Sequence, residues 1–105
     1  MLVDIKDIRV RLVTDWPNQV IVRLDNTPHY KFLFGIEQPY IDYLAKSNQP
    51  DHAVEKYRSL INNFDINKLG DILCIEKYGQ YIISDGFHRA CILLKMGYSQ
   101  IEITL

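Results

Sequence analysis

Apolar and polar side chains alternate along residues 8–13 and again along residues 20–24. A period of two places successive side chains on opposite faces of a β-strand. Residues 15–18, Asp-Trp-Pro-Asn, have the composition of a turn, so the pattern predicts an antiparallel hairpin. Three arginines lie on its polar face: Arg9, Arg11 and Arg23. That face is either a solvated outer surface or a patch for phosphates or nucleic acid.

Helical spacing replaces this alternation in the middle of the chain. Thr27 suits an N-cap, Pro28 a first helical position and Gly35 a stop, which predicts a short helix. The aromatic residues of this segment leave a strand as the competing interpretation. A second short helix is expected over 39–46 and a longer one over 51–64. The longer helix has one apolar stripe, formed by Ala53, Tyr57, Leu60, Ile61 and Phe64.

The last third of the chain predicts a hairpin followed by a crossover. Residues 71–76 and 80–84 are short and largely apolar, as paired strands are, and a helix follows that ends at Gly97. Residues 101–105 alternate again, so strand, helix and strand would form a right-handed crossover unit. We therefore expect an α+β fold, a small mixed β-sheet with packed helices, in a single domain over 1–105.

Composition narrows the classes of function. The formal net charge is −1, which gives no general attraction to nucleic acid. Charges interrupt every apolar run near the N-terminus, so we expect neither a signal peptide nor a membrane span, and a cytoplasmic location. Cys74 and Cys91 fit no metal-ligand spacing and are expected to be reduced thiols in the core.

The stretch 80–97 holds the candidate chemistry. Ser84-Asp85-Gly86 lies between the predicted strand and helix, and the first amides of a helix attract anions. Gly86 allows a tight turn and leaves room for a ligand. Arg89 offers a planar fork of donors for phosphate, and His88 can donate to a phosphate or carry a proton. Phe87 falls on the stripe that faces the core.

Asp85 has two interpretations. It could bind a metal ion such as Mg²⁺ or a ligand hydroxyl. Alternatively, Asp85 only caps the helix, while Arg89 pairs with a surface carboxylate. The residues alone leave both open.

The motif D-G-F-H-R, followed by A-C-I-L-L-K-M-G and I-E-I, resembles the ParB/sulfiredoxin superfamily over 72–103. Residues 51–105 would be the motif-bearing part and 1–48 a divergent part. The resemblance implies binding of a nucleotide (ADP, ATP or CTP) with Mg²⁺. It assigns this role to Ser84, Gly86, Phe87, His88 and Arg89, with Asp85 as the metal ligand.

The residue at position 87 indicates which branch of that superfamily the motif resembles most. Phe87 stands where sulfiredoxins have their reactive cysteine. The closest local pattern is D-G-H-H-R of the ADP-dependent free-serine kinases. This chain has Phe87 at the position of the first histidine of that pattern. This resemblance implies nucleotide binding more strongly than turnover.

Three functions remain open at this point. A phosphotransferase acting on a small hydroxyl-bearing molecule would use His88 and Asp85 with a further carboxylate, either Glu37 or Asp25. A non-catalytic module would sense a nucleotide or another phosphorylated metabolite. A DNA-binding or nuclease domain is the third, and a nucleic-acid partner is disfavoured by the charge.

The aromatic residues of the middle segment and two further histidines also have predicted roles. The aromatic residues of 30–43 form either a ligand wall or core. His29 and His52 are expected to be structural or solvated rather than metal ligands. Because the chain ends on a predicted strand, we expect it to be compatible with a piece of a longer chain. A homodimer is the other expected arrangement.

Overall fold

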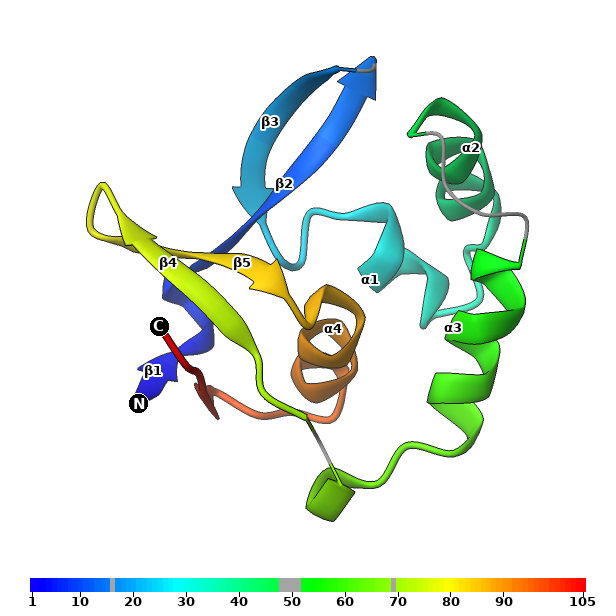
Figure 1. Cartoon of the computed structure of the whole chain (residues 1–105). Coiled ribbons are helices and arrows are strands. Elements are labelled where there is room, and N and C mark those ends of the chain that lie inside the picture. Colours follow the sequence, from blue (N-terminus) through cyan, green and yellow to red (C-terminus); the bar gives the residue numbers. More distant parts are fainter. Residues whose placement is uncertain (16, 48–51, 69) are drawn as a thin grey trace.

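The computed structural model describes residues 1–15, 17–47, 52–68 and 70–105. Its strands are β1 (Leu2–Asp4), β2 (Ile8–Asp15), β3 (Asn18–Arg23), β4 (Leu73–Lys77), β5 (Gln80–Asp85) and β6 (Gln100–Glu102). Its α-helices are α1 (Pro28–Phe32), α2 (Gln38–Lys46), α3 (Ala53–Asn62) and α4 (Phe87–Lys95). Two short 3-10 helices cover Ile5–Asp7 and Ile66–Lys68. Figure 1 shows the strands on one side of α4 and helices α1 to α3 on the other.

The main sheet has four strands in the order β3-β2-β5-β4. β2 pairs with β5 in parallel, and the two outer pairs are antiparallel, so the predicted α+β fold with a mixed sheet is confirmed. The predicted hairpin forms with Arg9 opposite Arg23 and Arg11 opposite Ile21. Cross-strand neighbours share a face, so the three arginines lie on one face as expected.

The predicted crossover into a neighbouring strand of this sheet is wrong. Both edges of β5 are already occupied, by β2 on one side and β4 on the other. The chain after α4 instead forms β6, which pairs antiparallel with β1 and places Ile101 opposite Val3. A single parallel bridge, Leu73 to Thr104, connects this two-stranded sheet to β4. The sequence pattern gave no sign that residues 2–4 would supply a strand.

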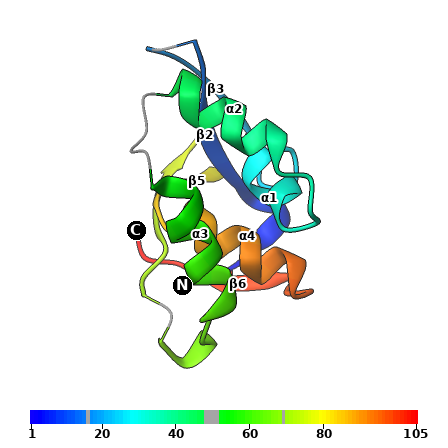
Figure 2. The ribbon, with the colours of Figure 1, turned by 90° about the vertical axis from the view of Figure 1, so that its right-hand side faces the viewer.

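Helix α4 is the central element of the core. Ala90, Cys91 and Leu93 pack into a cluster with residues from both sheets, such as Ile8 and Ile101. Ile92, from another side of the helix, packs into a second cluster with Phe32, Tyr40 and Tyr57 from α1, α2 and α3. Figure 2, turned by 90°, shows α3 running across α4. The middle of α4 is therefore packed between the sheets and the helices.

Local signals account for the middle of the chain. The Thr27 hydroxyl accepts a hydrogen bond from the Tyr30 amide at 3.1 Å and so caps α1, which settles helix over strand for this segment. The expected second helix forms as α2. The expected helix over 51–64 is α3; Asp51, its predicted first residue, lies outside the described residues, as does Trp16 of the hairpin turn. In the described parts of the chain, none of the helices has the length and apolar character that a membrane span requires.

Candidate functional site

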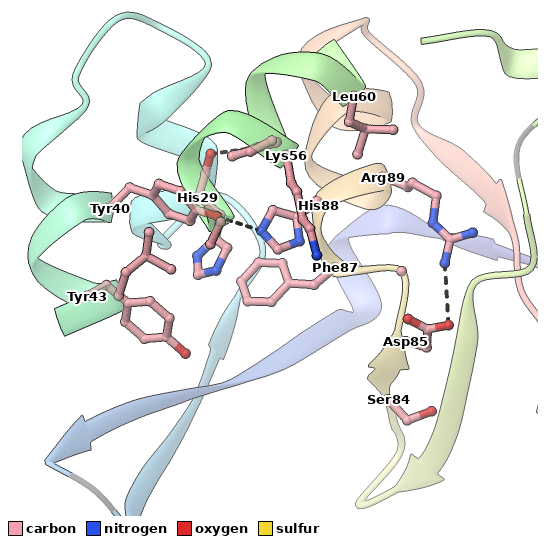
Figure 3. Close-up of a pocket in the computed structure, with 14 residues that line it drawn as sticks. His29, Tyr40, Tyr43, Lys56, Leu60, Ser84, Asp85, Phe87, His88 and Arg89 are labelled. Carbon is pink, nitrogen blue, oxygen red and sulfur yellow. Dashed lines mark hydrogen bonds and ion pairs between the residues drawn. The ribbon is translucent and has the colours of Figure 1, made fainter. Parts of the chain in front are cut away.

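A cavity of about 540 Å³ opens at the start of α4, between α2, α3 and the turn that leaves β5 (Figure 3). Its size is in the range of small-molecule sites. The described residues that line it are His29, Tyr40, Tyr43, Leu44, Ala53, Lys56, Tyr57, Leu60, Ser84, Asp85, Gly86, Phe87, His88 and Arg89. The whole predicted turn, Ser84 to Arg89, therefore lies in its wall.

Gly86 is the N-cap of α4 and has φ of +102°, the left-handed conformation expected for it. A Cβ at this position would lie 3.1 Å from Cγ1 of Ile72 and 3.2 Å from Nη2 of Arg89. No side chain of the described residues caps the helix, so the interpretation of Asp85 as a cap is wrong. The first amides of a helix have no partner within it and carry the positive end of its dipole.

Arg89 lies beside this helix start, where its guanidinium forms an ion pair with Asp85 at 3.6 Å. The Arg89 side chain is 22% exposed and that of Asp85 is 70% exposed. The guanidinium packs against the backbone of two glycines, Gly70 and Gly86, and a Cβ on Gly70 would overlap its Nη1. The cation is therefore held in place while the carboxylate remains in water.

His88 turns toward the helices rather than toward solvent. Its Nε2 lies 2.9 Å from the hydroxyl oxygen of Tyr40, the contact drawn as a dashed line in Figure 3. Burial lowers the pKa of His88 to about 4. The ring is therefore neutral near neutral pH, and His88 adds no positive charge to the cavity.

His29 is a cavity residue that the sequence analysis did not select. It is 3% exposed and stacks on Phe87, with ring centroids 3.9 Å apart. Burial, with a smaller effect of His88, lowers the pKa of His29 to about 2. Its Nδ1 is buried and has no hydrogen-bond partner among the described residues. A histidine in an aromatic segment carries no spacing signal, and only the fold brings it to α4. His52, by contrast, is exposed.

Phe87 is half-buried rather than a full core residue. It packs against the larger core cluster, as its place on the helical stripe predicts, and it also lines the cavity. Tyr40 and Tyr43 line the cavity too, whereas Phe32 belongs to the core and Phe34 is exposed. Part of the aromatic segment is thus a wall of the cavity and part of it is core.

Lys56 is the second cation of the cavity and was also missed by the sequence analysis. It comes from α3, one residue before the buried Tyr57. No carboxylate of the described residues lies within ion-pair distance of it. With Arg89 and Asp85 as the other charged lining residues, the described wall has a net charge of +1, two cations and one carboxylate.

The two carboxylates predicted for catalysis from the first half of the chain do not line the cavity. Glu37 precedes α2 and forms an ion pair with Arg58 at 2.6 Å. Asp25 forms an ion pair with Arg23 at 2.6 Å. Ser84 lines the cavity, but its hydroxyl donates to the backbone oxygen of Leu73. Asp85 is therefore the only carboxylate that the described wall contains.

The described residues do not fit a resident metal ion. No group of three or more histidine, cysteine, aspartate or glutamate side chains is close enough to hold one in the described parts of the chain. Asp85 alone, already paired with Arg89, is an incomplete ligand set for Mg²⁺. Cys74 and Cys91 are buried free thiols, and burial raises the pKa of Cys91 to about 12, which makes it a poor nucleophile.

Comparisons with protein-family models, with curated proteins and with solved structures find no match to this chain. The resemblance to the ParB/sulfiredoxin superfamily therefore stays a prediction from the motif.

Proposed function

We propose that this chain binds a small molecule that carries a phosphate group, with a nucleotide as the leading candidate. The observation that supports this most is the convergence of three anion-attracting features on one cavity. These are the uncapped start of α4, the held guanidinium of Arg89 and the ammonium group of Lys56. Charge-assisted hydrogen bonds from a guanidinium suit phosphate oxygens, and helix amides add to them.

A nucleotide is favoured over inorganic phosphate by the rest of the wall. Tyr43 and Phe87 lie in the same cavity, are only partly buried, and offer aromatic surface for a planar base. The resemblance of the D-G-F-H-R motif to nucleotide-binding turns supports the same proposal. ADP, ATP and CTP, alone or with Mg²⁺, are therefore the ligands to test.

Binding is proposed ahead of phosphoryl transfer. Transfer to a hydroxyl needs a group that positions or deprotonates the acceptor. Glu37 lies outside the cavity, Asp85 is paired with Arg89, and Phe87 occupies the position of the first histidine of D-G-H-H-R. A kinase remains the variant of this proposal in which Asp85 leaves its ion pair when substrate binds.

The arginine face of the hairpin is less suited to a nucleic-acid partner. Arg23 gives both of its hydrogen bonds to Asp25, and Arg9 donates to the backbone oxygens of Lys6 and Ile8. Only Arg11 of the three has no such contact among the described residues. We do not propose DNA binding.

Isothermal titration with AMP, ADP, ATP and CTP, each with and without Mg²⁺, tests the proposal. At least one nucleotide should bind to the wild type, and Arg89→Ala should weaken that binding about tenfold or more, the loss expected for a charged hydrogen bond. Arg58→Ala is the control, because it removes the same charge outside the cavity. Absence of binding, or equal effects of the two variants, would contradict the proposal.

An assay for phosphoryl transfer to small alcohols and amino acids distinguishes a non-catalytic binding module from a kinase. Nucleotide binding without turnover is the expected result. Turnover that is lost in His88→Ala would establish the kinase instead.

A further inference from the structure

The contact between His88 and Tyr40 joins two elements that are distant in the sequence. Tyr40 is in the first turn of α2 and is 0% exposed, while His88 is the second residue of α4. The 2.9 Å distance from Nε2 to the hydroxyl oxygen is a normal hydrogen bond. One hydrogen atom lies between these two atoms, and its position decides what His88 can offer to a ligand.

Both partners are uncharged near neutral pH. Burial raises the pKa of Tyr40 to about 12, and burial lowers the pKa of His88 to about 4. The hydroxyl therefore keeps its hydrogen, and the imidazole carries one hydrogen on either Nδ1 or Nε2. If Nε2 carried it, the ring would donate to the tyrosine oxygen.

The surroundings of Tyr40 favour the other arrangement. Its hydroxyl has no partner other than His88 among the described residues. If it did not donate to Nε2, its own hydrogen would be buried without an acceptor, which is unfavourable. With the hydroxyl as donor, Nε2 accepts and the histidine hydrogen lies on Nδ1, which has no partner among the described residues. Figure 3 shows this second ring nitrogen on the side of the ring away from Tyr40.

We propose that Tyr40 is a positioning residue that fixes His88 as the Nδ1–H tautomer, so that His88 donates an uncharged hydrogen bond to an anionic oxygen of the ligand. This rests on the proposed function, in which that oxygen belongs to a phosphate near the start of α4. In this tautomer Nδ1 of His88 donates a hydrogen bond to the ligand and cannot accept a proton as a base. The positive charge of the site comes from Arg89 and Lys56 alone among the described lining residues.

The tautomer is measurable without any ligand. Long-range ¹H–¹⁵N correlation spectra of the labelled protein at about pH 7 distinguish a protonated ring nitrogen from an unprotonated one, and His88→Gln assigns the signals. We expect Nδ1 protonated and Nε2 unprotonated in the wild type. The opposite pattern, or a rapid mixture of both tautomers, would overturn the proposal, and this reading does not depend on any variant of Tyr40.

Two tyrosine variants then test the role of the hydroxyl. Tyr40→Phe removes only the donor and should give His88 a mixture of tautomers. Tyr57→Phe is the matched control, because its buried hydroxyl donates to the backbone oxygen of His29 at 2.8 Å and not to His88. It should leave the His88 tautomer unchanged. Equal spectra of His88 in wild type and Tyr40→Phe would overturn the proposal.

Titration with AMP connects the tautomer to binding. Tyr40→Phe should weaken AMP binding by the factor by which the Nδ1–H population falls, about twofold if the two tautomers become equally populated. If Arg89→Ala weakens AMP binding but Tyr40→Phe does not, the role of Tyr40 is wrong while the phosphate site stands. If Arg89→Ala has no effect, the proposed function itself fails.

Discussion

His29 of α1 and Phe87 of α4 stack face to face, with ring centroids 3.9 Å apart and ring planes inclined by 21°. The stack joins the helical half of the molecule to the turn that carries the motif. Tyr40 and Tyr43 pack against the same imidazole ring in T-shaped arrangements. The cavity wall therefore includes a packed aromatic cluster that holds His29 in its neutral form.

Because His29 is buried and neutral, we expect the folded chain to lose stability in acid. Its pKa is about 2 in the folded chain and about 6.5 in the unfolded chain, so only the unfolded chain binds the proton as the pH falls below 6.5. The free energy of unfolding should therefore decrease on acidification, with a contribution from His29 of about 2 kcal/mol between pH 6.5 and 5. Urea denaturation at several pH values measures this.

His29→Phe provides the comparison, because it keeps an aromatic ring and removes the titrating group. Its stability should fall less steeply between pH 6.5 and 5 than that of the wild type. Parallel pH dependences for the two proteins would show that His29 is not held neutral by burial.

Gly86 and Gly97 form a matched pair for the strain at the start of α4. Both have positive φ, +102° and +95°, but only a Cβ at Gly86 would contact other groups. Gly97→Ala should lose about 1–2 kcal/mol, the cost of the left-handed conformation. Gly86→Ala should lose more, because the new methyl group also crowds Ile72. Equal losses in urea denaturation would contradict the close packing at Gly86.

Gly70→Ala tests whether the position of the Arg89 guanidinium beside Gly70 matters for binding. The new methyl group would overlap Nη1, and since this atom ends a flexible side chain the guanidinium can move away. We expect a small change in stability and a loss of nucleotide affinity that approaches the loss in Arg89→Ala. Wild-type affinity in Gly70→Ala would mean that the observed position of Arg89 is not the binding position.

Glu37→Gln separates the ion pair with Arg58 from a catalytic role. The pair is at the surface, so its loss should change the free energy of unfolding by less than about 1 kcal/mol. Nucleotide affinity should not change, because Glu37 does not line the cavity. A specific loss of phosphoryl transfer in this variant would restore Glu37 as a catalytic candidate.

The sequence was informative where the signal is local. Thr27, Pro28 and Gly35 defined a short helix, and the strand, glycine and helix order placed the turn at Ser84–Arg89. It failed where pairing is distant, because the partner of β6 is β1 at the other end of the chain. His29 and Lys56 reach the cavity only through tertiary packing, so no spacing in the sequence marks them. Glu37 was selected by position along the chain, which does not determine distance from the site.

The proposed phosphate site is tested most directly by locating a bound phosphate on the chain. Titration of ¹⁵N-labelled protein with AMP, followed by amide chemical shifts, should perturb Gly86, Phe87, His88 and Arg89 first, with Gly79 in the distant β4–β5 turn unchanged. Shifts confined to the face of Arg9, Arg11 and Arg23, or no shifts at millimolar AMP, would contradict a phosphate site at the start of α4.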